Sequence, residues 1–209
     1  MIDLWKYEKD LYYKGINFIG GVDEAGRGPL FGPVVAACVV LPSDFVLEGL
    51  TDSKKLSEKK RNVFYDYIMQ NSIAAEVGIV SALEIDEINI YAASRKAMII
   101  AIDKVREKVN LEYVLSDAMP IELDVPVLPI IKGDAKSITI AAASVVAKVT
   151  RDRIMYEVDK KYPEYGFKNH KGYPTKNHLL ALEKFGLIEG YRKTYGPVKK
   201  LLEVKNDNK

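Results

Sequence analysis

Residues 34–41, Val-Val-Ala-Ala-Cys-Val-Val-Leu, form an uninterrupted apolar run that constrains the fold more than any other segment. A strand with one face in water alternates apolar and polar side chains, and this run has no polar position. We therefore expect a strand that is buried on both faces and ends at Pro42. Helices must then cover both faces of its sheet. The other predicted strands are residues 17–23, 73–81, 112–117 and 127–131.

Helical spacing of apolar residues occurs between these strands. Ser57 is a suitable N-cap for the first predicted helix, Pro163 ends the longest one and Gly186 ends the last. The predicted helices are the one that follows Ser57 and those over residues 84–108, 134–162 and 177–185. Strands that alternate with helices in this way predict an α/β fold, with a sheet between helices.

The length of 209 residues corresponds to one domain, with an appended lobe, at about 150 residues per domain. The composition turns basic at residues 162–166, which is the only candidate boundary. We expect a core over residues 1–162 and a basic helical C-terminal lobe over residues 163–209, packed on the core as part of the same unit.

Several classes of protein are excluded by composition. A single cysteine, Cys38, excludes a disulfide framework and a cysteine-rich zinc site, and its place in an apolar strand predicts an inert buried thiol. No apolar run is long enough to span a bilayer, and the first six residues lack the apolar block of a signal peptide. We therefore expect a soluble, cytoplasmic protein.

The charge is distributed unevenly along the chain. Residues 160–209 contain 12 Lys and Arg against 5 Asp and Glu, a net charge of +7, so the first 159 residues carry −5 of the total of +2. A basic segment on an acidic body suits a partner with a phosphate backbone. A solvated lysine-rich surface that binds nothing explains the same numbers, and charge alone slightly favours this second interpretation.

The string Asp23-Glu24-Ala25-Gly26-Arg27-Gly28-Pro29-Leu30-Phe31-Gly32-Pro33 carries the most chemical information. Two adjacent carboxylates end a predicted strand, and because neighbours on a strand point to opposite faces, they can share a metal only where the strand ends. Gly26 and Gly28 permit a close approach of the backbone to a ligand, and Arg27 supplies a cation. A tight turn capped by acids is the common alternative for an isolated Asp-Glu pair.

Two further acids stand at the ends of predicted elements. Asp117 ends a strand, where it is most simply a turn residue, and Asp134 begins the long helix, where it is most simply an N-cap. With Asp23 and Glu24 they place four carboxylates where α/β sheets build their sites. Clustered carboxylates repel one another unless divalent cations neutralise them or their pKa values rise. An all-oxygen set of ligands favours Mg²⁺ or Mn²⁺.

These motifs resemble a known family. The string 23–33 is similar to the signature of the type 2 ribonucleases H (ribonuclease HII), and residues 132–137, continued by 140–152, are similar to its second signature. Lys171-Gly172-Tyr173-Pro174-Thr175-Lys176-Asn177-His178 resembles its third, and the blocks 51–56 and 87–90 match as well. The matching blocks extend from about residue 20 to residue 198 in the order of the family.

The resemblance implies a ribonuclease H-like fold, with a central mixed five-stranded sheet flanked by helices and a small helical C-terminal lobe. It also implies hydrolysis of the RNA strand of RNA–DNA hybrids, including cleavage on the 5′ side of single ribonucleotides embedded in duplex DNA, with two divalent ions (Mg²⁺ or Mn²⁺). The implied partners are these nucleic acids, and the implied state is a monomer. The lack of an N-terminal DNA-binding domain before Asp23 argues against the related ribonuclease HIII.

The resemblance also assigns residues. Asp23, Glu24, Asp117 and Asp134 match the catalytic and metal-binding acids. The residues that match substrate-binding positions are Gly26, Arg27 and Gly28, in the loop that reads 2′-hydroxyls at the RNA–DNA junction, and Tyr173, which stacks on the sugar after the ribonucleotide. The chain departs from the common pattern at Ala118, where glycine is frequent, at Tyr191, where histidine is common, and at Tyr195, where phenylalanine is usual.

The other chemically active side chains have simpler explanations. Lys54, Lys55, Lys148, Lys171 and Lys176 are candidate phosphate contacts, although each alone is more often a solvated surface lysine. We interpret His170 and His178 as capping or surface residues without a catalytic role.

Two other functions remain as alternatives: a non-catalytic nucleic-acid-binding module of the same fold, and a metal-dependent hydrolase of small phosphate esters. The presence of all four acids argues against the first. The basic tail and the Gly-Arg-Gly loop argue against the second.

Overall fold

The computed structural model describes residues 3–207, and the side chains of residues 3–203. Its centre is a five-stranded sheet with the strand order β3-β2-β1-β4-β5. The strands are β1 (Ile19–Ala25), β2 (Val34–Val40), β3 (Ala74–Val80), β4 (Tyr113–Asp117) and β5 (Val127–Ile130). β2 pairs antiparallel with β1 and β3, whereas β4 pairs parallel with β1 and β5, so the sheet is mixed, as predicted.

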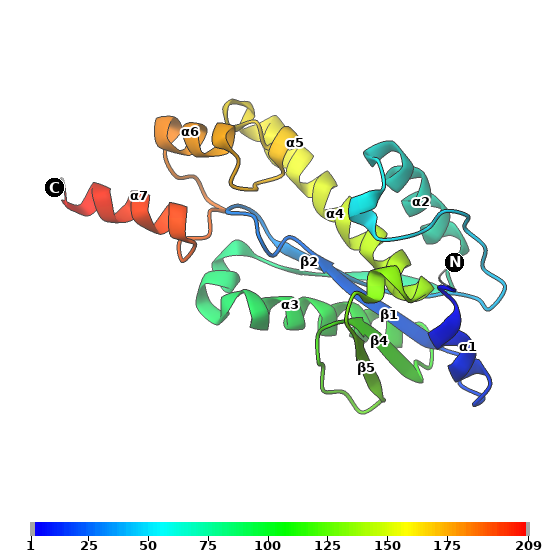
Figure 1. Ribbon diagram of the computed structural model, residues 1–209. Helices are drawn as coiled ribbons and strands as arrows, with labels where there is room; N and C mark the ends of the chain where they lie inside the picture. Colours follow the sequence, from blue (N-terminus) through cyan, green and yellow to red (C-terminus); the bar gives the residue numbers. More distant parts are fainter. Residues whose placement is uncertain (1–2, 208–209) are drawn as a thin grey trace.

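Helices cover both faces of the sheet (Figure 1). α3 (Ala82–Arg106) packs on β2 and β3 on one face. α4 (Ile138–Lys161) packs on β1 and β2 on the other face, with α2 (Glu58–Asn71) beside it. All seven residues of β2 are buried, which confirms the expectation from the apolar run. The short helix α1 (Lys6–Tyr12), which the sequence analysis did not predict, lies near the start of β1.

Glycine in β1 and β3 allows the helices to approach the sheet closely. A Cβ atom at Gly21 in β1 would lie 2.1 Å from the carbonyl carbon of Thr139 in α4, and one at Gly78 in β3 would lie 2.0 Å from the carbonyl oxygen of Ala97 in α3. Neither position has room for a side chain. Four alanines of α4 are buried, and their small side chains are consistent with the close approach of this helix to β1 at Gly21.

Hydroxyl side chains begin the main helices. Ser57 caps α2 as predicted, because its Oγ accepts a hydrogen bond from the N–H of Lys60 at 3.3 Å. The expectation that Asp134 begins the long helix is wrong: Asp134 lies in a separate 3-10 turn, η2 (Gly133–Ala135), and Ser137 is the N-cap of α4. A serine hydroxyl can accept from the helix N–H groups, which frees the carboxylate of Asp134 for another role.

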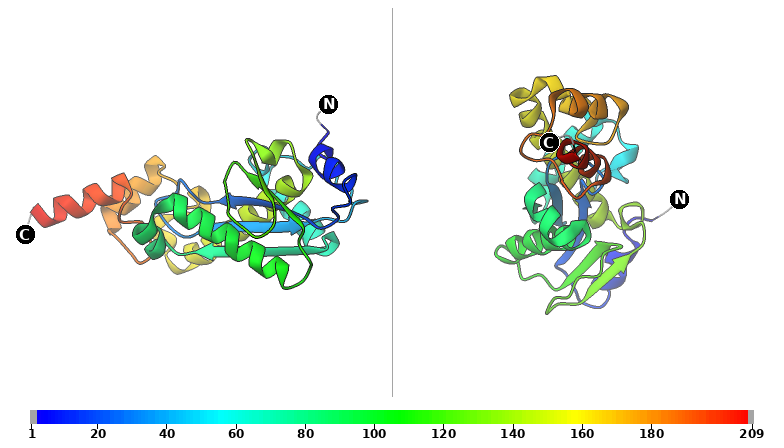
Figure 2. Two further views of the ribbon diagram at one scale, coloured as in Figure 1. Left: turned by 90° about the horizontal axis from the view of Figure 1, so that it is seen from below. Right: turned by 90° about the vertical axis from the view of Figure 1, so that its left-hand side faces the viewer.

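Residues after α4 form the C-terminal lobe, with η3 (Pro163–Tyr165), α5 (Phe167–His170), α6 (Lys176–Phe185) and α7 (Gly196–Asp207). The lobe packs through Phe167 and Tyr191 on Leu30, Phe31 and Met155 of the core. Tyr191, a departure from the family pattern, is therefore a packed residue. α7, also absent from the sequence analysis, extends away from the sheet (Figure 2). Among the described residues, no helix is long and apolar enough to cross a membrane.

Candidate active site

Three aspartates from three elements converge at one edge of the sheet. Asp23 lies near the end of β1, Asp117 ends the parallel neighbour β4, and Asp134 lies in η2. Val22 pairs with Ser116, so the two strands place their acids side by side. One carboxylate oxygen from each aspartate lies within 4.8 Å of the others. The N–H of Gly133 donates to Oδ1 of Asp117 at 2.7 Å, which ties η2 to β4.

The electrostatics of this cluster favour a bound cation. Burial raises the pKa of Asp23 well above its ordinary value, and the neighbouring charges of Glu24 and Asp117 raise it further. The pKa of Asp134 is raised by burial, by Asp117 and by Asp52, whose carboxyl group faces it. Carboxylates that repel one another at such distances gain most from a divalent ion, and a donor set of oxygens alone fits Mg²⁺ or Mn²⁺. The aspartates therefore fit the metals that the sequence analysis expects.

Glu24 borders the same cavity but is not one of the three convergent acids. Its Oε1 accepts from Nη1 of Arg27 at 3.2 Å, and its Oε2 is buried without a hydrogen-bond partner among the described residues. Burial raises the pKa of Glu24, although the Arg27 guanidinium opposes this effect. The structure thus brings three of the four predicted acids together and holds the fourth beside them by an ion pair.

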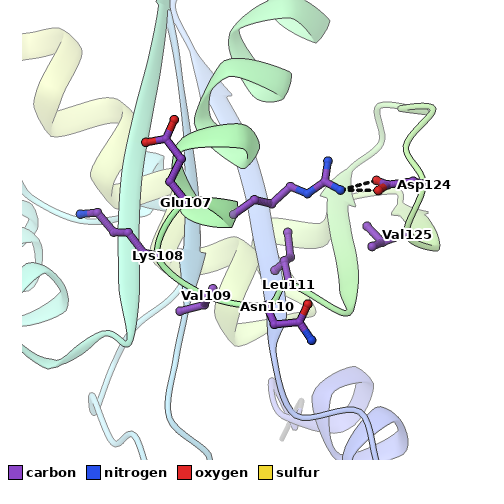
Figure 3. A pocket seen from close by; sticks show the side chains of 8 residues that line it. Glu107, Lys108, Val109, Asn110, Leu111, Asp124 and Val125 are labelled. Carbon is purple, nitrogen blue, oxygen red and sulfur yellow. Dashed lines mark hydrogen bonds and ion pairs between the residues drawn. The ribbon is translucent and has the colours of Figure 1, made fainter.

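A cavity of about 280 Å³ opens over this edge. Its lining includes Asp23, Asp117, the loop from Gly26 to Gly28, and Tyr173. Ser53 and Ser144, which the sequence analysis did not assign to the site, also line it, although both lie in the matching blocks 51–56 and 140–152. A larger hollow of about 470 Å³ lies beyond the end of α3, next to the Arg106–Asp124 ion pair (Figure 3), and contains none of the predicted site residues.

Two buried arginines hold the loop that follows β1. Arg192 from the lobe donates to the carbonyl oxygens of Gly26 at 2.6 Å and Arg27 at 2.9 Å. Arg151 from α4 donates to Phe31 and Pro33 at 3.0 Å each. In a trans peptide the N–H points opposite to the preceding C=O, so the N–H groups of Arg27 and Gly28 point away from Arg192. Neither arginine was singled out from the sequence, because their partners are distant along the chain.

Gly26 and Gly28 differ in what surrounds them. Gly26 is buried with a φ of +101°, and a Cβ there would lie 2.2 Å from Nε of Arg151. Gly28 is exposed, and its nearest neighbour is the ring of Tyr173 at 3.4 Å from an added Cβ. Glycine at 26 is therefore required by the Arg151 brace, whereas a Cβ at position 28 would only touch the ring of Tyr173 at an ordinary contact distance.

Two histidines fix the loop that carries Tyr173. Nδ1 of His178 lies 2.8 Å from the carbonyl oxygen of Tyr173, and the N–H of Gly172 donates to Nδ1 of His170 at 3.2 Å. Both histidines are buried, and their rings stack at 4.3 Å between centroids, so the expectation of surface residues is wrong. The hydroxyl of Tyr191 meets Nε2 of His178 at 2.9 Å. Burial lowers the pKa of His178 to about 4, so the ring is neutral near pH 7.

The candidate phosphate contacts fall into two groups. Lys54 and Lys148 line the cavity, whereas Lys55 and Lys176 are exposed and do not. Burial alone would lower the pKa of Lys54, but the nearby aspartates, led by Asp23, raise it. Lys54 is thus a charged group that faces the acids.

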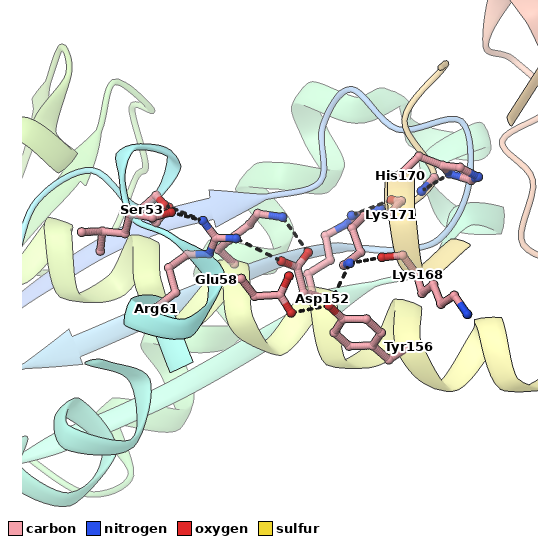
Figure 4. Close-up of polar contacts among 12 residues, drawn as sticks. Ser53, Glu58, Arg61, Asp152, Tyr156, Lys168, His170 and Lys171 are labelled. Atoms are coloured by element: carbon pink, nitrogen blue, oxygen red, sulfur yellow. Dashed lines mark hydrogen bonds and ion pairs between the residues drawn. The ribbon is translucent and has the colours of Figure 1, made fainter. Parts of the chain in front are cut away.

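Lys148 is held in place by a polar network that links α4 to α2, and Figure 4 shows its members Asp152, Arg61 and Ser53. Its Nζ donates to Asp152 at 2.6 Å, and the other oxygen of Asp152 lies 4.0 Å from the guanidinium of Arg61. Arg61 in turn donates to the carbonyl oxygen of Ser53 at 3.1 Å. Lys171 donates to the hydroxyl of Tyr156 at 3.0 Å, away from the cavity lining.

Comparison with known proteins identifies the family to which this chain is similar. The family model described as Ribonuclease HII matches residues 20–194. Ribonuclease HII of Bacillus cytotoxicus is 52% identical over 204 residues, which cover 98% of this chain and 78% of that protein. The crystal structure of the ribonuclease H2 from Pyrococcus horikoshii has a TM-score of 0.76 at 26% identity and covers 91% of this chain and 99% of that one.

A third comparison supports the fold alone. The crystal structure of Bst-RNase HIII in complex with Mn²⁺ has a TM-score of 0.66 at 16% identity, with 91% of this chain and 71% of that chain covered. The sheet order and the carboxylates at the strand ends agree with the family match. The chain belongs to the ribonuclease HII family, whose members are endoribonucleases that hydrolyse the RNA strand of RNA–DNA hybrids.

Proposed function

We propose that this chain cleaves RNA–DNA hybrids and also cuts duplex DNA on the 5′ side of a single embedded ribonucleotide, with two divalent metal ions. The observation that carries the proposal is the cavity shared by Asp23, Asp117, the Gly26–Gly28 loop and Tyr173. It combines a place for cations with a place where one sugar can be examined. Neither a binding module nor a small-ester hydrolase needs this combination.

Asp23, Asp117 and Asp134 are the proposed metal ligands, with Glu24 as the fourth acid beside them. Asp23 would be the most firmly placed of these ligands, because its strand is paired on both sides. When bound, two such ions supply an activated water and stabilise charge on the departing 3′-oxygen. Mn²⁺ is present in the Bst-RNase HIII complex, which supports Mg²⁺ or Mn²⁺ as the ion used here.

The loop from Gly26 to Gly28 is the proposed reader of the 2′-hydroxyl, the group that distinguishes RNA from DNA. The brace from Arg192 fixes its peptide planes, so that the N–H groups of Arg27 and Gly28 are available on the outer side. Tyr173 is 40% exposed and lies next to Gly28, where its ring can stack on the following sugar. Lys54, Lys55 and Lys148 are the proposed phosphate contacts, with Lys54 and Lys148 nearest the reacting strand.

The test is a cleavage assay on three end-labelled duplexes: a long RNA–DNA hybrid, DNA with one ribonucleotide, and DNA alone. We expect Mg²⁺-dependent cleavage of the first two, a product that ends immediately 5′ of the single ribonucleotide, and no product with chelator. If the hybrid is cut but the single-ribonucleotide duplex is not, junction recognition is refuted, whereas the proposed hybrid cleavage stands. Cleavage that persists in chelator would refute the metal assignment.

We also propose that residues 1–162 and 163–209 act as one unit and that the protein is a monomer. The lobe supports this through Arg192, which reaches the loop after β1, and through the aromatic residues packed on Phe31. A single calorimetric transition and a monomer mass in light scattering are expected. Two separate transitions would show that the lobe folds independently.

A further inference from the structure

Glu8 is a buried carboxylate that the proposed reaction does not use. It lies on the seven-residue helix α1 and is 0% exposed. Its Oε1 accepts from the hydroxyl of Ser137 at 2.6 Å, from the hydroxyl of Thr139 at 2.8 Å and from the N–H of Thr139 at 3.1 Å. The carbonyl oxygen of Leu4 accepts from the N–H of Ile138 at 2.9 Å. The segment from Leu4 to Glu8 thus binds three successive residues, 137–139, at the start of α4.

These three residues directly follow the turn that carries Asp134. The N–H groups of Lys136 and Ser137 donate to the carbonyl oxygen of Gly133 at 2.9 and 2.8 Å, so the turn and the helix start are one hydrogen-bonded segment. On its other side this segment lies against β1, where Gly21 leaves no room for a Cβ next to Thr139. Glu8 therefore holds the segment on one side, and the strand of Asp23 holds it on the other.

Burying a carboxylate costs desolvation free energy, so attachment of α1 alone does not explain Glu8. Burial raises the pKa of Glu8, and its Oε2 has no hydrogen-bond partner among the described residues. Leu11 already anchors α1 through apolar contacts with Ile19 and Ile140. Apolar residues of similar volume usually stabilise a fold at least as well as a buried charge does. The directional hydrogen bonds of Glu8 therefore fix the position of Ser137 and Thr139 more than they add to the stability of the fold.

We propose that Glu8 is a positioning residue that fixes the η2–α4 junction through Ser137 and Thr139 and so holds Asp134 within reach of Asp23 and Asp117. This inference rests on the proposed function, because it takes Asp134 as a metal ligand. Outer groups that orient metal ligands change metal affinity by about 10–100-fold when removed. The predicted consequence is therefore a change in metal affinity, with hybrid binding unaltered.

The experiment measures Mn²⁺ binding by isothermal titration calorimetry, together with the Mg²⁺ dependence of hybrid cleavage. For Glu8→Ala we expect an affinity for Mn²⁺ about 10-fold weaker and a similar rise in the Mg²⁺ concentration for half-maximal cleavage, with the KM for hybrid unchanged. Glu8→Gln keeps an oxygen at the Oε1 position, and we expect it to restore most of the metal affinity.

Leu11→Ala is the matched control, because it weakens the same helix without a contact to Ser137 or Thr139. We expect it to lower the melting temperature while Mn²⁺ affinity stays at the parent value. The inference is overturned if Glu8→Ala binds Mn²⁺ like the parent protein, or if Leu11→Ala weakens binding equally, since Glu8 would then contribute only to stability.

Asp134→Asn separates this inference from the proposed function. Weaker Mn²⁺ binding in Asp134→Asn, with none in Glu8→Ala, would refute the role of Glu8 and leave the metal site intact. Unchanged Mn²⁺ binding in Asp134→Asn would instead refute the assignment of Asp134 as a ligand, and the inference with it.

Discussion

The acid cluster and the Tyr173 loop border the same cavity, but one is a group of crowded negative charges and the other is held by neutral side chains. Asp23, Asp117 and Asp134 are like charges crowded at strand ends, with a raised pKa for Asp23. Tyr173 is held by His170 and His178, two buried rings that must stay neutral. The carboxylates of the acid cluster repel one another, and a bound cation would relieve that repulsion. The histidines of the Tyr173 loop already have hydrogen-bond partners within the protein. The proposed metal ligands and the proposed recognition residue can therefore be tested separately.

The pH dependence of stability should have opposite signs in the two regions. A carboxyl group whose pKa is raised by folding, as at Asp23, favours the folded protein at low pH, and this contribution is lost as pH rises through the raised value. A histidine whose pKa is lowered by folding, as at His178, contributes stability above its ordinary value of 6.5 that is lost as pH falls towards about 4.

The largest effect is expected from Asp23→Asn. The substitution removes a ligand charge and almost no volume, so cleavage should fall at least about 10³-fold while hybrid binding stays near the parent value. Single-turnover kinetics in saturating Mg²⁺ and a binding titration measure the two quantities. In chelator the same variant should melt at a higher temperature than the parent, because it removes a buried, repelled carboxylate. Normal turnover would show that Asp23 is not a ligand.

Tyr173→Ala tests the recognition side alone. The lost aromatic contact corresponds to about 1–3 kcal/mol by analogy with base stacking, or about 5–150-fold in kcat/KM on the single-ribonucleotide duplex. The loss on a long hybrid should be smaller, because its junction is not the only site of cleavage. Tyr173→Phe should retain most activity, and Tyr13→Ala, at a residue 89% exposed, serves as a remote control. Equal losses on both substrates would make Tyr173 a packing residue.

Lys54→Ala tests whether the cavity lysines bind the nucleic-acid backbone. Each phosphate contact contributes about 0.7–0.9 to the slope of log affinity against log salt, so the slope should fall by that amount in this variant. Lys14→Ala, at an exposed residue before β1, should leave the slope unchanged. Fluorescence anisotropy with labelled hybrid from low to moderate salt measures it. If the affinity of the parent protein does not depend on salt, the basic segment after residue 160 is a solvated surface that does not bind the nucleic-acid backbone.

The smallest effect is the pH response of the lobe. His178→Asn should melt at a lower temperature than the parent at pH 7, because contacts to Tyr173 and Tyr191 are weakened. The difference in melting temperature between parent and variant should become smaller as pH falls from 6.5 towards 4, because protonation of His178 destabilises the parent. Calorimetry in chelator provides the measurement. A constant gap across this range would mean that His178 does not titrate with folding.

Local sequence alone determined the sheet and the chemistry of the site. The apolar run in β2 predicted a strand covered on both faces, which the structure confirms, and the acids at strand ends predicted a cation site, which stays a proposal. Both predictions could be made from the sequence because burial and charge are properties of single residues and their immediate neighbours. The position of Asp134 was misplaced by a few residues, because an acid and a serine are both good N-caps and only the folded chain selects Ser137.

Tertiary structure decided which of these groups meet and what holds them. Glu24 carries the same charge as Asp23, but it is the next residue within β1, so its side chain leaves on the opposite face and pairs with Arg27 instead of joining the other acids. Arg192 braces Gly26 from 166 positions away, and Glu8 reaches Ser137 from 129 positions away. Side-chain hydrogen bonds across such separations leave no local pattern of residue types, because any partner of the right shape that folding brings near can make them.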